Sequence, residues 1–144
     1  MAGKSIRKGC FLTDMKILYL RTLYAIGLKA GGSVGHTAGV IHALAKLVTL
    51  KVVTNDELAE VKEPMRVIRP WVRKYAPVSI KEACCNIQFL FALSKEVGMF
   101  DGIYHRHAAY SFIGAFFSKK HHIPLILEFN SSEVWKAEHW TVKN

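Results

Sequence analysis

Several features that would place this 144-residue chain in a well-marked class are missing from it. No apolar run approaches the roughly 20 residues that a membrane-spanning helix needs. Near the N-terminus, the apolar residues 10–12 that follow Lys4, Arg7 and Lys8 are too few for the core of a signal peptide. The three cysteines have no CxxC spacing, so we expect reduced thiols rather than disulfides. Together these absences predict a cytoplasmic protein.

Acidic residues are also scarce, since 11 Asp and Glu face 20 Lys and Arg and leave a formal net charge of +9. Such a charge attracts nucleic acid, anionic lipid and phosphorylated ligands. The basic residues are dispersed, and the sequence contains no RGG run, aromatic RNA-binding signature or zinc-finger spacing. We therefore expect no nucleic-acid partner. Either the charge is an ordinary basic surface, or the protein lies peripherally on an anionic membrane surface.

The composition favours one folded domain. Hydrophobic residues make up 51% of the chain and charged residues 22%, which is typical of a globular protein with a real core. The sequence shows neither an internal repeat nor a low-complexity linker. We therefore expect one domain over residues 1–144, with residues 1–14 as a flexible lead-in.

The first half of the chain reads as a strand, a glycine-rich loop, a helix and a second strand. Residues 16–21 form a short apolar run typical of a strand buried on both faces. After the glycine pair Gly31 and Gly32, Ser33 is expected to cap a helix, and residues 50–54 form the next strand. The helix is expected to bury one apolar stripe, namely Val34, Ala38, Ile41, Leu44, Ala45 and Val48.

The second half continues the alternation. Strands are expected at residues 65–69, 101–105 and 125–129, with a deeply packed helix at 108–120. A capping box of Ser79 and Glu82 predicts a further helix that runs toward Gly98. The pattern predicts a Rossmann-like α/β domain of three layers with a mainly parallel sheet of about five strands. The buried stripe of the 79–98 helix is expected to be Ile80, Ala83, Cys84, Ile87, Leu90 and Phe91.

In a parallel sheet, ligands bind beyond the carboxyl ends of the strands, so the loops 22–35, 105–108 and 129–135 are expected to converge. Glycines at positions 31 and 32 let the backbone approach a ligand, and the N-terminus of the following helix suits a phosphate. The spacing is neither GxGxxG nor the Walker pattern, so binding of a dinucleotide or ATP is poorly supported. The alternative is that the two glycines only make a tight turn.

Polar side chains at the same edge are candidates for binding a substrate. Arg106, beside His107 at the end of a strand, suits a phosphate or a carboxylate held by two hydrogen bonds. Glu128 closes an apolar strand and could hydrogen-bond sugar hydroxyls or orient Arg106. His36 lies in the first turn of the first helix and is either a substrate contact or structural. No carboxylate or cysteine completes a metal site with the histidines, so we expect no metal.

These residues resemble a known family. Residues 31–40, the strand end at 52–55, and the segments 101–106 and 127–135 are similar to retaining, family-4-like glycosyltransferases of the GT-B fold. The resemblance covers roughly residues 16–135. It implies the N-terminal of two Rossmann-like domains, which receives the acceptor while its glycine loop approaches a nucleotide-sugar donor. It also implies transfer of the hexosyltransferase type.

The resemblance assigns roles to the candidate residues. Gly31, Gly32 and Ser33 would line the donor site, and Arg106 would face the transferred sugar or the acceptor. Glu128 and Asn130 would lie at the acceptor rim. His36 and His107 are further candidates for substrate contacts because of their position at the same edge of the sheet. The acceptor would be a sugar, a lipid or another molecule, and the nucleotide-sugar would be a co-substrate without any other cofactor.

Two departures from the family pattern shape the expectation. Residues 47–51 replace the Gly-His-Glu that the family commonly has before the second strand, and the donor-binding domain with its paired glutamates is absent from the 144 residues. We therefore expect this chain to need a C-terminal donor-binding domain or subunit and to be inactive alone. One rival is a stand-alone module that binds a sugar, a phosphate or another subunit. A dehydrogenase is less favoured, because GxGxxG and an acidic end of the second strand are missing.

Overall fold

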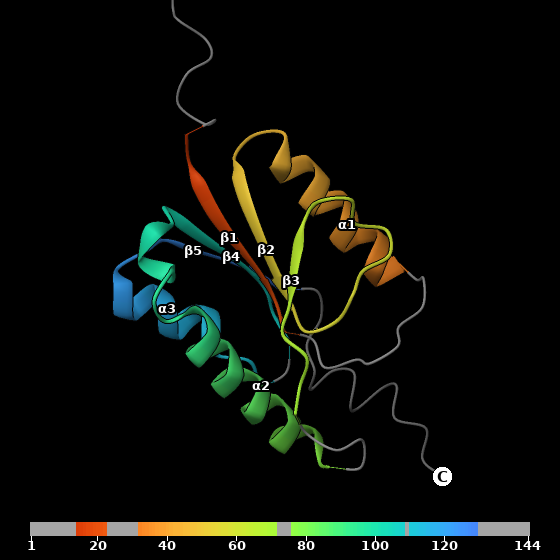
Figure 1. Ribbon diagram of the computed structural model, residues 1–144, viewed down its shortest axis with the longest axis vertical. Helices are drawn as coiled ribbons and strands as arrows, with labels where there is room; N and C mark the ends of the chain where they lie inside the picture. The colour runs from red at the N-terminus through yellow and green to blue at the C-terminus, as the bar shows by residue number, and fades with distance from the viewer. Residues whose placement is uncertain (1–13, 23–31, 72–75, 109, 130–144) are drawn as a thin grey trace, which may run out of the picture.

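Five parallel strands form one sheet at the centre of the protein (Figure 1). The computed structural model describes residues 14–22, 32–71, 76–108 and 110–129. The sheet order is β3-β2-β1-β4-β5, and every neighbouring pair is parallel. This confirms the predicted α/β class and the five-stranded parallel sheet. The strands are β1 (Lys16–Arg21), β2 (Thr49–Thr54), β3 (Met65–Val67), β4 (Gly102–Arg106) and β5 (Leu125–Glu128).

Helices cover both faces of the sheet, which gives the three layers of a Rossmann-like domain (Figure 1). The helix α1 (Gly32–Ala45) lies on one face. On the other face lie α2 (Val78–Leu93) and α3 (Ile113–His121), with the short 3₁₀ helix η1 (Val97–Met99) between α2 and β4. Strands alternate with helices along the chain except between the parallel strands β2 and β3, which residues 55–64 connect without a helix.

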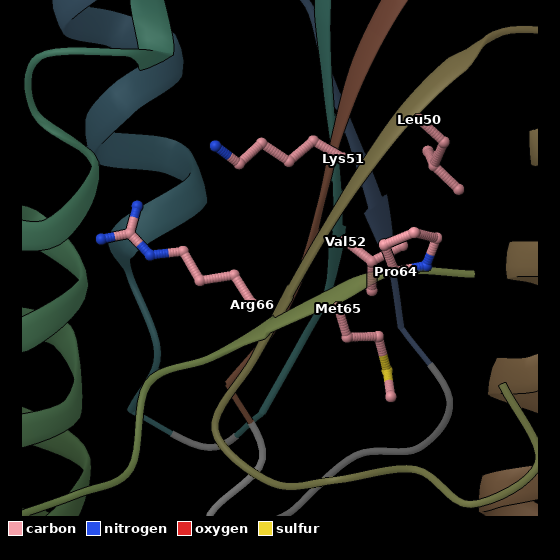
Figure 2. A pocket seen from close by; sticks show the side chains of 6 residues that line it. All are labelled: Leu50, Lys51, Val52, Pro64, Met65 and Arg66. Carbon is pink, nitrogen blue, oxygen red and sulfur yellow. The ribbon is translucent and has the colours of Figure 1, made fainter. Parts of the chain in front are cut away.

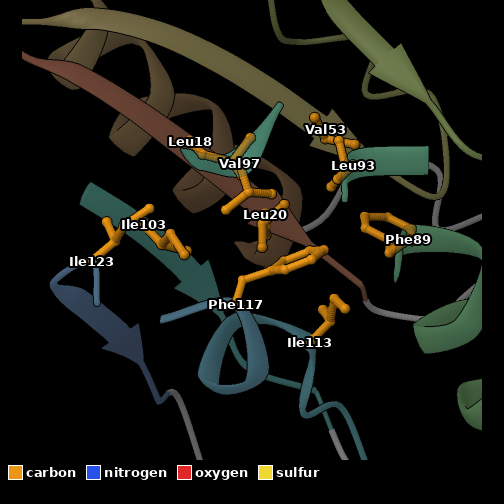
Figure 3. Close-up of a cluster of buried hydrophobic side chains, with 10 residues drawn as sticks. All are labelled: Leu18, Leu20, Val53, Phe89, Leu93, Val97, Ile103, Ile113, Phe117 and Ile123. Carbon is orange, nitrogen blue, oxygen red and sulfur yellow. The ribbon is translucent and has the colours of Figure 1, made fainter. Parts of the chain in front are cut away.

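Alternating side chains of β1 divide the core into two clusters. Leu18 and Leu20 point toward α2 and α3, where they pack with Phe89 and Phe117 (Figure 3). Tyr19 points the other way, into a cluster with side chains of α1. Because β1 is buried on both faces, it reads as a continuous apolar run.

The helix α1 buries the first three residues of the predicted stripe, begins earlier than predicted and ends at Ala45, before Val48. Val34, Ala38 and Ile41 are buried against the sheet, as the spacing of three and four residues indicates. The helix starts at Gly32, so Ser33 lies inside its first turn and does not precede it as a cap.

The predicted buried face of α2 is wrong. Ile80, Ile87 and Phe91 are exposed, and the helix turns a partly polar face to the core. The predicted capping box is also wrong, because α2 begins at Val78 after Pro77 and has no side-chain cap. The helix ends at Leu93, so Gly98 does not cap it but lies within η1. The buried face of α2 consists of Glu82, Cys85, Asn86, Gln88, Phe89 and Leu93.

Asn86 gives the physical reason for that orientation. Its Oδ1 accepts hydrogen bonds from the backbone N–H groups of Phe112 and Ile113, both at 3.1 Å. Its Nδ2 donates to the carbonyl oxygens of Glu82 and Tyr110. The first N–H groups of a helix have no partner within that helix, so a side chain of α2 supplies the acceptor for the start of α3. Burying Asn86 turns the more apolar stripe of α2 outward.

The helix α3 is shorter than predicted and is not buried all round. It begins at Ile113 rather than 108, and Phe116 in α3 and Phe112 just before it are exposed. Only one side of the helix, which includes Ile113, Gly114 and Phe117, packs into the core.

Candidate functional site

Four of the predicted site residues meet at the carboxyl edge of the sheet. Arg106 at the end of β4 donates from Nη1 to Glu128 Oε1 at 2.5 Å and from Nη2 to Ser33 Oγ at 3.1 Å. His36 Nε2 lies 3.1 Å from the same Glu128 oxygen. The Tyr104 hydroxyl donates to Glu128 Oε2 at 3.1 Å. We call Ser33, His36, Tyr104, Arg106 and Glu128 the Arg106–Glu128 cluster.

Register explains why the cluster forms. Arg106 and Glu128 are paired residues at the ends of the neighbouring parallel strands β4 and β5. Both side chains are almost fully buried. Because little water reaches them, the attraction between their opposite charges offsets the cost of removing each charge from solvent. Ser33 and His36 reach the pair from the first turn of α1. Glu128 thus orients Arg106, one of the two roles that the sequence suggested for it.

The hydroxyl of Tyr104 is held as a donor to Glu128. Burial, followed by the charge of Glu128, raises the pKa of Tyr104 to about 12. Its ring stacks on Tyr19 with centroids 5.2 Å apart. Burial also raises the pKa of Tyr19. Both phenols therefore stay protonated at neutral pH.

A second arginine, which sequence reasoning missed, lies next to Arg106. Arg21 ends β1 and pairs in register with Arg106 on β4. Because side chains alternate along a strand, Arg21 and Arg106 share the sheet face of Tyr19 and Tyr104. The signal was an arginine as the last residue of an otherwise apolar buried strand.

The guanidinium of Arg21 is fully buried and incompletely paired. Its Nη1 forms an ion pair with Asp56, while Nε and Nη2 have no acceptor among the described residues. Burial raises the pKa of Asp56, although Arg21 acts in the opposite direction. A buried N–H group without an acceptor costs about 1–3 kcal/mol. This corner of the edge therefore has two unmet donors, which suit an anionic group.

On the other sheet face, His105 belongs to a buried polar group of three side chains. Its Nε2 lies 3.1 Å from Thr22 Oγ1 and 3.3 Å from Ser111 Oγ, and the two hydroxyls are 2.6 Å apart. Burial, with a smaller contribution from His107, lowers the pKa of His105 to about 4. The imidazole is therefore neutral at neutral pH and links the ends of β1 and β4 to the start of α3.

The remaining predicted residues are placed less centrally. His107 follows β4, and its ring packs at 5.6 Å from the ring of Phe129 rather than on the Arg106–Glu128 cluster. Gly32 is the first residue of α1. Gly31 and Asn130 lie outside the described residues. Within the described parts of the chain, no three His, Cys, Asp or Glu side chains gather as a metal site would require.

Two hollows elsewhere do not offer a comparable site. One lies at the β2–β3 edge, where Figure 2 shows Lys51 and Arg66 pointing away from Leu50 and Met65. Both cations are already paired with Glu96, Arg66 at 2.6 Å, which leaves them poorly placed to hold an anion. The other, of about 360 Å³, lies between the C-terminal end of α1 and the amino ends of β1, β4 and β5, and its lining is almost wholly apolar.

Comparison of the chain with family models, curated proteins and solved structures found no match. Among the described helices, none has the length and apolarity to cross a membrane. The fold and the geometry of the site define the structural class of this protein. It is a Rossmann-like α/β domain in which neighbouring parallel strands end at buried arginines and a carboxylate.

Proposed function

We propose that this chain is the N-terminal, acceptor-side domain of a retaining GT-B glycosyltransferase that uses a nucleotide-sugar donor in the cytoplasm. It would act with a C-terminal donor-binding domain or subunit. The resemblance of residues 31–40, 101–106 and 127–135 to that family motivates the proposal.

The observation that carries the proposal is the buried pair of arginines at the carboxyl edge. Arg21 and Arg106 are neighbours in register, and Nε and Nη2 of Arg21 have no acceptor among the described residues. A diphosphate offers oxygens that suit such donors, and the start of α1 adds its partial positive charge at the same edge. In sugar transfer, this wall would help to neutralise the leaving diphosphate.

Glu128 and His36 would serve the acceptor or the transferred sugar. Glu128 is held by Arg106 and Tyr104, so its position is fixed before a ligand arrives. His36 is about half exposed, which leaves its ring accessible to a hydroxyl group. Holding a hydroxyl against the reacting carbon contributes to the rate mainly through orientation.

A stand-alone binding module is the second candidate, because the unmet donors of Arg21 would equally suit a phosphate without any catalysis. The DNA that follows codon 144 separates the two. A donor-binding domain encoded there, or in a neighbouring gene, supports the transferase. A natural stop without such a neighbour favours the module.

Equilibrium binding to the purified chain tests the site directly. We expect UDP- and GDP-sugars to bind, and Arg21→Gln to weaken binding about tenfold or more, because the guanidinium donors without an acceptor in the described structure are lost. Arg69→Gln is the matched control, since Arg69 is exposed and pairs only with the exposed Glu57 in the described structure. Equal affinity of the two variants would contradict the assignment of the edge as the binding site.

A further inference from the structure

The outer surface of α2 and α3 carries a patch of exposed apolar side chains. On α2, Ile80, Ile87 and Phe91 are exposed to 51%, 46% and 78%. Phe112, just before α3, and Phe116 within it are exposed to 48% and 40%. A stripe of this kind normally faces a protein core or another apolar partner. We call these five residues the α2–α3 face.

The exposed side chains of α2 lie beside those of α3. Both helices lead into strands of the same parallel sheet and lie on one side of it, as Figure 1 shows. Asn86 joins them, because it binds the backbone of Phe112 from the position next to Ile87. Phe91 and Phe116 each follow by one helical turn, on α2 and α3. The exposed side chains therefore form one surface rather than scattered positions.

Positive charge borders this surface at the C-terminal ends of the two helices. Lys95, Lys119 and Lys120 are exposed at the ends of the two helices. Lys120 Nζ lies 5.9 Å from the ring centroid of Phe116. Of the three carboxylates in α2 and its connection to β4, Glu82 is buried, Glu96 pairs with cations of β2 and β3, and Asp101 accepts a hydrogen bond from the backbone N–H of Lys16.

Acidic side chains are placed elsewhere in the described structure. Glu57 and Glu60 are exposed in the connection from β2 to β3, and Glu63 in the same connection pairs with His42 of α1. Exposed carboxylates thus gather in the connection from β2 to β3, whereas Lys95, Lys119 and Lys120 lie beside the aromatic rings of the α2–α3 face. That combination matches a membrane interface with anionic lipids, where lysines meet phosphates and aromatic rings enter the boundary of the acyl chains.

We infer that the α2–α3 face docks this protein on an anionic membrane surface. The lysines contact lipid phosphates, and Phe91 and Phe116 insert beside them. A second copy of the chain fits less well, because a two-fold contact through this face would bring Lys119 and Lys120 of both copies together. The inference does not depend on the proposed transferase activity, since it concerns a different surface.

Co-sedimentation of the purified chain with vesicles tests the inference. We expect binding to vesicles of phosphatidylcholine with phosphatidylglycerol, little binding to phosphatidylcholine alone, and weaker binding at high salt. Phe91→Asp should lower partitioning about tenfold or more. Lys119→Gln with Lys120→Gln should lower it roughly 25-fold, at about fivefold for each lysine near the surface.

Matched variants on the opposite face sharpen the test. Leu47→Asp changes an apolar side chain of 51% exposure that follows α1, on the face of the sheet opposite to α2 and α3. Lys46→Gln with Lys62→Gln removes two exposed lysines on the α1 side. These variants should retain binding, and circular dichroism should show every variant folded. Equal recovery on neutral and anionic vesicles would overturn the inference. So would an equal loss in the Leu47→Asp variant, or a dimer without lipid that Phe91→Asp dissociates.

Discussion

Adding a methyl group to Gly114, in the first turn of α3, would place it against the buried imidazole of His105. A Cβ at that position would lie 2.4 Å from His105 Nδ1 and 2.9 Å from its Cβ, so something must move. The imidazole is held by the hydroxyls of Thr22 and Ser111 and has no free space to enter. Overpacking costs about 1–3 kcal/mol, and disturbing a buried hydrogen bond adds about 1 kcal/mol.

The higher helix propensity of alanine offsets at most about 1 kcal/mol of this destabilisation. We therefore expect Gly114→Ala to lower the free energy of unfolding by about 2 kcal/mol, measured by urea denaturation. Gly39→Ala is the control, because Gly39 lies inside α1 and a Cβ there meets nothing within 4 Å. That variant should match or exceed the parent chain in stability. Equal stability of the two variants would contradict the inference that His105 is packed rigidly under α3.

Three further predictions concern buried polar groups. Because the pKa of His105 is about 4 in the folded chain against an ordinary 6.5, the unfolded chain binds more protons between these values. The contribution of His105 to the free energy of unfolding is therefore complete above about pH 6.5 and declines as the pH falls toward 4. If the free energy of unfolding changed with pH equally in the parent chain and in His105→Gln, this prediction would be refuted. Asn86→Ala should lower the unfolding free energy by about 1–3 kcal/mol through the unpaired N–H groups of α3, whereas Ser94→Ala should change it little; thermal and urea unfolding compare them. Cys85, whose pKa burial raises to about 12, should resist N-ethylmaleimide at pH 8 in the folded chain while the half-buried Cys84 reacts faster; peptide mapping that finds equal labelling would contradict the burial.

The elements that follow hydrophobic periodicity could be predicted from the sequence. The strand at β1 is apolar because helices cover both its faces, and the stripe of α1 from Val34 to Ile41 faces the sheet. The face of α2 could not be predicted in the same way. Its orientation depends on Asn86 binding backbone groups more than twenty residues later, which no local pattern records.

The candidate site was partly predictable for a similar reason. The rule that strand ends converge brought Ser33, Arg106 and Glu128 to one edge, because it requires only the order of elements. Tyr104 was missed because it reads as an ordinary strand residue, and Arg21 because its one signal, an arginine at the end of an apolar strand, does not identify its neighbours. Their significance comes from register: Arg21 lies opposite Arg106, and Tyr104 points to the same face as both.

We propose that this domain forms one wall of a nucleotide-sugar transfer site. The most direct test is a turnover assay with the purified chain alone and with a matching C-terminal donor-binding domain, joined or mixed. We predict no measurable transfer by the chain alone, activity in the pair, and loss of that activity in Gly32→Val, because a β-branched side chain would occupy the space where the first residue of α1 meets the donor. Robust turnover by the chain alone, or a folded Gly32→Val variant that still transfers sugar in the pair, would contradict the account.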